Sequence, residues 1–464
     1  MLKVTDFIEK NHERYISELR QLCAIPSVST KSEHKPDIER CARWLADHMK
    51  NIGLENVEII PTEGHPIIYA DWLHAPGKPT LLIYGHYDVQ PAEPLDLWLS
   101  PPWELTLRDG DLYARGVVDD KGQVFIHLKA LEAFFKNEGK LPVNVKLMIE
   151  GEEEVGSENL YRFIEKEKER LEADALVVSD TCMLGKGIPS ICYGLRGLSY
   201  YEMEVIGPSV DLHSGSFGGA VPNPLNIACE MMAKLKDADG RVTIPGFYDD
   251  VLPLTEKERK LLAELPFDEK TFQATTGAKE LPGEKGYSVA ERIWARPTLD
   301  INGMYGGYEG EGAKTVIPSK ATVKFSTRLV PNQDPVKIAR LVEEHMKRIA
   351  PPSVTINFKI LSTGKWWLAP FEHPIIQAGK RALEEGFQKK AVFIREGGSI
   401  PLVSMIYESL HKPCVLLGFG LPDENAHAPN ERLHLENYLK GILSIAYFYH
   451  EVGQLPPEAA RAAA

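Results

Sequence analysis

Several short motifs bring together residue types that could bind divalent metal ions. His86-Tyr87-Asp88 follows an apolar run, and residues i and i+2 of an extended segment point the same way. The Asp88 carboxylate could therefore accept a hydrogen bond from the His86 imidazole and fix its tautomer. Further along, Asp119 and Asp120 open a helical pattern. Four glutamates lie within 150–154, where a cation would relieve their mutual repulsion.

Two more residues extend this set. Asp180 follows the apolar run 175–178, and His427 lies in the loop 424–431. Imidazole and carboxylate ligands suit zinc, manganese or cobalt. One carboxylate can bridge two ions ~3.5–4 Å apart by giving an oxygen to each. The set therefore predicts a pair of divalent ions with Asp119 between them.

Each motif alone also has a simpler interpretation. His86 and His427 could be ordinary surface or loop histidines. Asp119 could belong to a helix N-cap, Asp180 to a turn, and the glutamates to a solvated acidic loop. Their shared position after apolar runs favours the metal site, because the carboxyl ends of strands form the ligand crevice of open α/β sheets.

The elements that would position these residues alternate between strand and helix. Apolar runs at 81–84, 143–149 and 175–178 are separated by helical patterns at about 121–137 and 158–171. Continuous apolar strands that alternate with helices indicate an α/β fold, in which helices flank both faces of a mostly parallel sheet.

A different pattern follows residue 194. Strand-like segments at 198–206, 298–305, 320–330 and 353–361 and helical segments at 223–236 and 335–349 are interrupted by an acidic insertion at about 238–296. The order β-α-β-β-α-β is that of a ferredoxin-like α+β domain, although an unrelated α+β domain is an alternative.

The last hundred residues return to the α/β pattern. We therefore predict a catalytic domain in two parts, 1–194 and 366–464, with the α+β domain inserted at 195–365.

Composition limits the class of protein. The formal charge of −13 argues against nucleic acid or an anionic membrane surface as a partner. No stretch approaches the ~20 apolar residues that a membrane span requires. The six cysteines are scattered, and the first residues do not resemble a signal peptide, so we expect a cytoplasmic protein.

The motifs occur together, and in order, in a known family. His86-x-Asp88, Gly116-x-x-Asp119-x-Lys121-Gly122, Glu150-Gly-x-Glu153-Glu154-x-Gly156-Ser157, Asp180 and 426–431 resemble the aminoacylase/carboxypeptidase G/carnosine dipeptidase family of dinuclear metallopeptidases. Within that family the chain is most similar to cytosolic non-specific dipeptidases, through segments at 196–197, 212–215, 312–318, 328–331 and 395–401.

The resemblance implies roles for the metal-site residues. His86 and Asp180 would hold one ion, Glu154 and His427 would hold the other, and Asp119 would bridge them. Asp88 would orient His86, and Glu153 would be the general base that takes a proton from a water between the ions. The fold implied is a zinc-peptidase-like catalytic domain with an inserted lid and dimerisation domain.

The inserted domain would also contribute to the site. By resemblance, His213 and Thr315 would reach the active site of the partner in a homodimer, and His213 would donate a hydrogen bond to the oxyanion. Arg328 and Ser399, with the backbone of Gly398, would hold the substrate carboxylate.

The expected function is metal-dependent hydrolysis of amide bonds in small substrates, most simply dipeptides, with zinc or else manganese or cobalt. The alternatives are an N-acetyl or N-succinyl amino acid deacylase, an aminopeptidase for longer peptides, and a non-catalytic binding protein on the same fold.

Overall fold

The chain is described by a computed structural model that covers residues 1–461. Residues 462–464, the end of the predicted second part of the catalytic domain, lie outside the described residues. The chain forms two compact units. The first consists of residues 1–193, 369–394 and those from 405 onward, and the second consists of 194–368 and 395–404.

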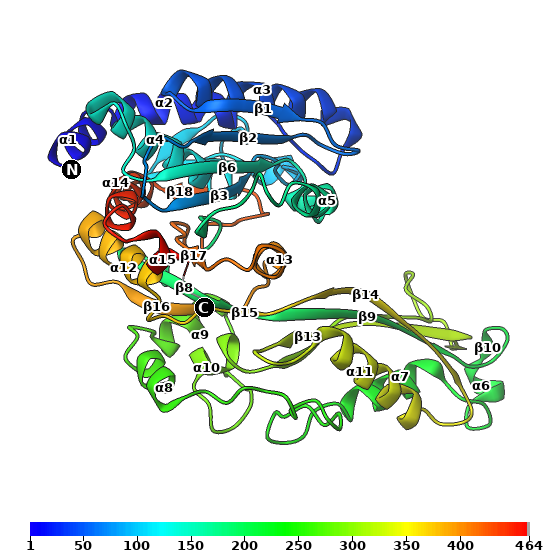
Figure 1. Cartoon of the computed structure of the whole chain (residues 1–464). Helices are drawn as coiled ribbons and strands as arrows, with labels where there is room; N and C mark the ends of the chain where they lie inside the picture. Colours follow the sequence, from blue (N-terminus) through cyan, green and yellow to red (C-terminus); the bar gives the residue numbers. More distant parts are fainter. Residues whose placement is uncertain (462–464) are drawn as a thin grey trace. The chain divides into compact units, whose positions relative to one another are not determined.

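A mixed sheet forms the centre of the first unit (Figure 1). Seven of its nine strands run in the order β1 (Glu55–Ile60), β2 (Ile67–Trp72), β6 (Asn144–Glu150), β3 (Thr80–His86), β7 (Ala175–Val178), β17 (Cys414–Leu416) and β8 (Ser190–Leu195). Neighbours are parallel from β6 through β3 and β7 to β17. The strands outside this core, β1, β2 and β8, pair antiparallel. The predicted mostly parallel sheet is confirmed.

Burial explains why these strands form. Every residue of β7 is buried, as is every residue of β3 and β6 after the first, which requires cover on both faces. Helix α3 (Lys35–Ile52) packs against β1 and β2, and α4 (Lys121–Glu138) packs against β3. Helices α12 (Pro374–Phe387) and α14 (Leu435–Val452) pack against each other, and α4 also packs on α14.

The second unit contains an antiparallel sheet in the order β11 (Thr298–Tyr305), β13 (Lys320–Leu329), β9 (Gly197–Ile206) and β14 (Thr355–Gly364). Alternate residues of β9 are buried, as expected for a sheet with one face on a core. Helices α7 (Pro224–Ala233) and α11 (Pro335–Ile349) pack on this sheet. The chain order β9-α7-β11-β13-α11-β14 is the predicted ferredoxin-like pattern.

The insertion at 238–296 is more regular than its sequence indicated. It contains the short helices α8 (Glu256–Ala263), α9 (Glu269–Thr276) and α10 (Val289–Trp294). Capping boxes begin α8 at Thr255 and α10 at Ser288, which satisfies backbone N–H groups that such short helices leave free.

The division into units differs from the predicted domains at residues 194 and 366–368, which fall in the second unit, and in one longer segment. Residues 395–404, predicted within the second part of the catalytic domain, group with the second unit. Buried Arg395 pairs with Glu258, the Arg196 side chain donates to the carbonyl of Gly397 at 2.9 Å, and residue 399 bonds to β13 as described below. These contacts are long-range and leave no periodic signal in the sequence.

Among residues 1–461, none of the helices is both long enough and apolar enough to cross a membrane.

Candidate metal centre

The predicted metal-binding residues lie where elements of the first unit end or begin. His86 is the last residue of β3, and Asp180 follows β7. Glu154 lies in the single turn η3 (Glu153–Val155) after β6, and Asp119 precedes α4. Strands β3 and β6 are parallel with His86 opposite Glu150, so these ends meet at one edge of the sheet. His427 comes from the loop before β18 (Arg432–His434).

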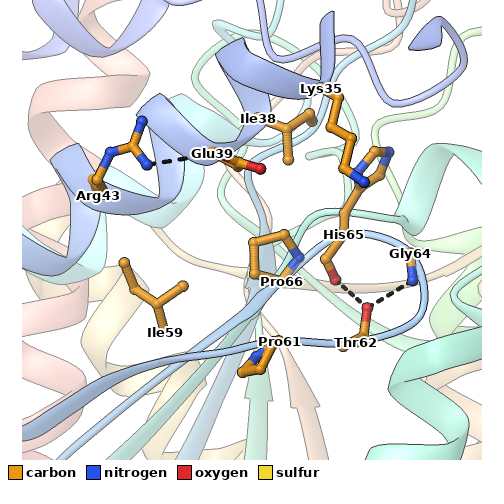
Figure 2. Close-up of a pocket in the computed structure, with 10 residues that line it drawn as sticks. All are labelled: Lys35, Ile38, Glu39, Arg43, Ile59, Pro61, Thr62, Gly64, His65 and Pro66. Atoms are coloured by element: carbon orange, nitrogen blue, oxygen red, sulfur yellow. Dashed lines mark hydrogen bonds and ion pairs between the residues drawn. The ribbon is translucent and has the colours of Figure 1, made fainter.

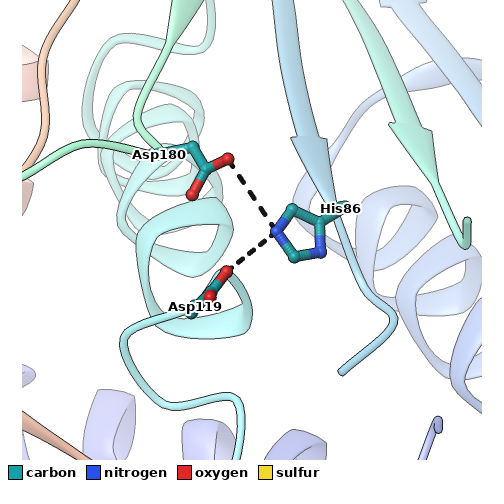
Figure 3. A group of neighbouring side chains, drawn as sticks. All are labelled: His86, Asp119 and Asp180. Atoms are coloured by element: carbon teal, nitrogen blue, oxygen red, sulfur yellow. Dashed lines mark hydrogen bonds and ion pairs between the residues drawn. The ribbon is translucent and has the colours of Figure 1, made fainter. Parts of the chain in front are cut away.

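One group of candidate ligands consists of His86, Asp119 and Asp180, drawn in Figure 3. Nε2 of His86 lies 3.0 Å from Oδ1 of Asp119 and 3.9 Å from Oδ2 of Asp180. In the figure both carboxylates point toward the same ring nitrogen. One ligand atom from each residue lies within 4.8 Å of the others, a spacing that allows a shared cation.

A second group consists of Asp119, Glu154 and His427. Nε2 of His427 lies 2.8 Å from Oδ2 of Asp119 and 3.2 Å from Oε2 of Glu154. The two oxygens of Asp119 therefore face two different histidines, one in each group. This is the arrangement that a carboxylate bridging two ions requires.

The chemistry of the donors fits a pair of divalent cations. Oε1 of Glu154 is buried and has no hydrogen-bond partner, although a buried carboxylate oxygen normally has one. Burial raises the pKa of Asp180 well above its usual range, and neighbouring Asp120 raises it further. A bound cation would give the Glu154 oxygen a partner and would stabilise the charged form of Asp180. Imidazole and carboxylate donors with no thiolate suit zinc, manganese or cobalt.

The histidines balance part of this negative charge. Hydrogen bonds to Asp119 and Glu154 raise the pKa of His427 to about 10. Burial raises the pKa of Asp119. Hydrogen bonds from His427 and His86 lower it by more, so the pKa lies below its usual range. Nε2 of each imidazole faces Asp119 and is the atom that a metal ion would take, so ion binding requires that this nitrogen carry no proton.

Asp88 holds the turn that carries the predicted base. It is buried, and its two carboxylate oxygens accept the backbone N–H groups of Glu153 and Glu154 at 3.2 and 3.1 Å. Nδ1 of His86 contacts the backbone carbonyl of Asp88 at 3.1 Å and its carboxylate at 3.4 Å. Asp88 is therefore positioned to orient both the imidazole and the glutamate turn.

Glu153 has the electrostatics of an acid–base group. Burial raises the pKa of its carboxyl to about 7; His86 lowers that pKa, and Glu154 raises it. A carboxyl with a pKa near neutrality can both accept and return a proton at physiological pH.

The other predicted site residues belong to the second unit. His213 ends β10 (Leu212–His213), which pairs with β12 (Val316–Ile317). Nδ1 of His213 accepts the backbone N–H groups of Gly215 and Ser216 at 3.1 and 3.2 Å. The neutral ring then carries its proton on Nε2, which lies 3.5 Å from the exposed hydroxyl of Thr315. His213 can thus donate a hydrogen bond to a third group.

Arg328 and Ser399 are neighbours in the same unit. Nη1 of Arg328 donates to Oγ of Ser399 at 2.9 Å, and this hydroxyl donates to the carbonyl of Arg196 at 2.5 Å. Gly398 is exposed, and its carbonyl accepts the backbone N–H of Arg196 at 3.2 Å. Burial and, to a smaller extent, the positive charge of Arg328 lower the pKa of Arg196 to about 10. Two guanidinium groups so placed would favour an anion.

Three residues near the candidate sites had no assigned role from sequence. Gln90 donates to Oε2 of Glu154 at 2.8 Å, and a loop glutamine carries no metal-site signal. Asp120 does not cap α4 with its side chain; instead, its carboxylate accepts the backbone N–H of His86 at 3.2 Å. Arg196 belongs to the segment 196–197 that supported the family resemblance, but only the fold shows that it lies beside Arg328.

A separate cavity of about 430 Å³ lies beside α3 (Figure 2). Its lining comes from α3 and from residues 59–66, and none of the candidate metal ligands contributes to it. The metal centre is thus defined by its converging side chains and not by this cavity.

Comparisons with known proteins show the family to which the chain belongs. Residues 82–451 match Peptidase family M20/M25/M40. The Cys-Gly metallodipeptidase dug1 of Schizosaccharomyces pombe is 35% identical and aligns over 98% of this chain and 99% of its own length. The crystal structure of human carnosine dipeptidase 1 has a TM-score of 0.84 at 33% identity, covering 98% of each chain. A metallo-carboxypeptidase of Sulfolobus solfataricus also has a TM-score of 0.84 at 33% identity, covering 95% of this chain and 99% of that one.

The protein is thus a hydrolytic metallopeptidase, by its fold, its cluster of candidate ligands and these relatives. It belongs to Peptidase family M20/M25/M40.

Proposed function

We propose that this metallopeptidase is a dipeptidase that uses two divalent ions bridged by Asp119. The observation that carries the proposal is the placement of the two Asp119 oxygens, 3.0 Å from the nitrogen of His86 and 2.8 Å from that of His427. His86 and Asp180 would hold one ion, and His427 and Glu154 would hold the other. A non-catalytic binding protein would have no need of Glu153 beside this complete ligand set.

When bound, two divalent ions lower the pKa of water and polarise the carbonyl of the scissile amide. Glu153 takes the proton from the attacking water on its carboxylate. It then returns that proton to the leaving amine, acting first as a base and then as an acid. The Nε2–H of His213 donates to the oxyanion, a contact typically worth ~3 kcal/mol in the transition state.

The choice of a dipeptide as substrate rests on the anion site and on the relatives. Arg328, beside Ser399 and Arg196, offers a planar guanidinium to a free C-terminal carboxylate. One relative is named a Cys-Gly metallodipeptidase, and another is titled a carnosine dipeptidase. A third relative is called a metallo-carboxypeptidase, and for this reason the substrates below include longer peptides.

A substrate panel tests this proposal. The purified protein is freed of metal, loaded separately with zinc, manganese and cobalt, and assayed on alanyl and glycyl dipeptides, tripeptides, and N-acetyl and N-succinyl amino acids. We expect kcat/KM to be highest for dipeptides. Preference for the acylated amino acids would replace the proposal with a deacylase, and preference for longer peptides would replace it with an exopeptidase of wider range. Glu153→Gln, which should retain both ions, is the control for contaminating activity.

We further propose that the protein is a homodimer in which His213 and Thr315 complete the partner's active site. Their support is local: both side chains are exposed, and the His213 ring has a donor available on Nε2. Glu153→Gln and His213→Ala should each be inactive alone. If His213 acts across the dimer, mixing the two after dissociation should restore about a quarter of wild-type activity, because each mixed dimer then holds one complete site. A mixture that stays inactive would assign His213 to its own subunit's site or to none.

A further inference from the structure

We infer that the buried ion pair of Arg115 and Glu431 positions the metal centre by joining the chain segments that carry His86, Asp119 and His427. The pair lies in the first unit, and both side chains are 1% exposed. Nη1 of Arg115 donates to Oε2 of Glu431 at 2.7 Å. This inference rests on the proposed two-metal function and assigns a role to two residues that bind neither metal nor substrate.

Glu431 holds the turn that presents the bridging aspartate. Its Oε2 accepts the backbone N–H of Gly116 at 2.8 Å in addition to the bond from Arg115. Its Oε1 accepts the backbone N–H groups of Val118 and Asp119 at 3.0 and 3.2 Å. One carboxylate thus holds three backbone N–H groups of this turn, the last of which belongs to Asp119 itself.

Arg115 also forms hydrogen bonds with the chain segments that follow His86 and His427. Its Nη2 donates to the carbonyl of Pro91 at 3.1 Å and to that of Ala428 at 3.2 Å. Pro91 follows the segment that begins with His86, and Ala428 is the residue after His427. Glu431 lies four residues beyond His427 in the same loop. A planar guanidinium with several donors can make these contacts at once, whereas a lysine ammonium is a single point charge.

The arrangement has a consequence for metal binding. The loop of His427 is exposed and irregular, and the side chain of His427 is 55% exposed, so packing alone does not fix it. The ion pair supplies the missing constraint by fastening that loop to the Asp119 turn. Residues that orient metal ligands in this indirect way typically change metal affinity or activity ~10–100-fold when they are altered.

Glu431→Gln is the principal test, because glutamine has nearly the same shape. In either orientation its NH₂ group would face N–H donors, either those of Val118 and Asp119 or those of Arg115 and Gly116. Zinc binding to the metal-free protein is measured by competition with a fluorescent chelator. We expect ~10–100-fold weaker zinc binding, and at saturating zinc a KM for a dipeptide within about twofold of wild type.

Asp174→Asn provides a matched control. Asp174 is 4% exposed, accepts the backbone N–H of Thr80 at 2.7 Å and pairs with Arg461 at 2.6 Å. It therefore resembles Glu431 chemically, but it immediately precedes β7 and contacts the first residue of β3, whereas His86 is the last residue of β3. Asp174→Asn should lower stability and leave zinc affinity within about twofold of wild type. Arg115→Lys serves as a second variant if Glu431→Gln does not fold, with ~10-fold weaker zinc binding expected.

The outcomes are distinguishable. Wild-type zinc affinity in a folded Glu431→Gln or Arg115→Lys variant would overturn the inference and leave the two-metal function intact. An equal loss of zinc affinity in Asp174→Asn would also overturn it, since general destabilisation would then explain the effect. A wild-type protein that binds no zinc pair would refute the proposed function itself.

Discussion

Asp88→Asn tests how the buried carboxylate supports the centre. In the folded protein the two oxygens of Asp88 accept the N–H groups of Glu153 and Glu154, and one oxygen lies 3.4 Å from the His86 ring. Asparagine keeps one acceptor and turns an NH₂ group toward one of these donors. The variant thus loses a charge-assisted hydrogen bond and leaves a buried N–H without a partner.

The size of the effect follows from these contacts. A hydrogen bond to a charged group contributes about 1.5–3 kcal/mol, and a buried group left unsatisfied costs about 1–3 kcal/mol. Removing one charge from a crowded acidic site offsets part of this loss, because Asp88 also raises the pKa of Glu150 and Glu153. We expect the metal-free variant to be about 2 kcal/mol less stable and zinc binding to weaken ~10–100-fold.

Urea unfolding of the metal-free protein and zinc competition measure the two quantities separately. Asp47→Asn, at an exposed position of α3, is the control for a change of charge without buried contacts. If Asp88→Asn unfolds within about 0.5 kcal/mol of wild type and binds zinc equally well, the carboxylate does not hold the turn as described.

Further predictions concern the base, the anion site and acid stability. Glu153→Gln should retain its metal but lose activity ~10²–10⁴-fold or more, measured as kcat with metal content checked by elemental analysis. Arg328→Lys should raise KM for dipeptides ~10-fold with a smaller change in kcat, since lysine cannot grip a carboxylate at two points; an unchanged KM would remove Arg328 from substrate binding. Burial lowers the pKa of His127 to about 3, and its ring bonds to Ser179 and Tyr449. The neutral His127 ring therefore makes its full contribution to the free energy of unfolding above pH 6.5. This contribution is lost as the pH falls toward 3, by about 2 kcal/mol at pH 5. Urea unfolding of His127→Gln should show a flatter pH dependence than wild type.

Much of the first unit could be predicted because its strands are buried on both faces. The runs 81–84 and 175–178 are continuous in apolar residues, and such runs need cover from helices on each side. Once a parallel sheet is inferred, the residues that follow its strands must share an edge. This reasoning placed His86 and Asp180 together, although 94 residues of sequence separate them.

Contacts that depend on pairing between distant segments could not be predicted. Nothing local in β1 and β2 indicates that they extend the sheet antiparallel, because strand direction is decided by connections and partners. Residues 395–404 belong to the second unit because side chains such as Arg395 contact residues that are distant in the sequence. The hydrogen bonds that Glu431 accepts could not be predicted either, because their donors are backbone N–H groups, which do not depend on residue type.

The central claim is that Asp119 bridges two divalent ions, and a crystal structure of the zinc-loaded protein tests it most directly. Anomalous diffraction at the zinc edge should reveal two peaks per chain, one beside His86 and Asp180 and the other beside Glu154 and His427, with an Asp119 oxygen facing each. A single peak, or peaks that Asp119 does not touch, would contradict this account of the centre.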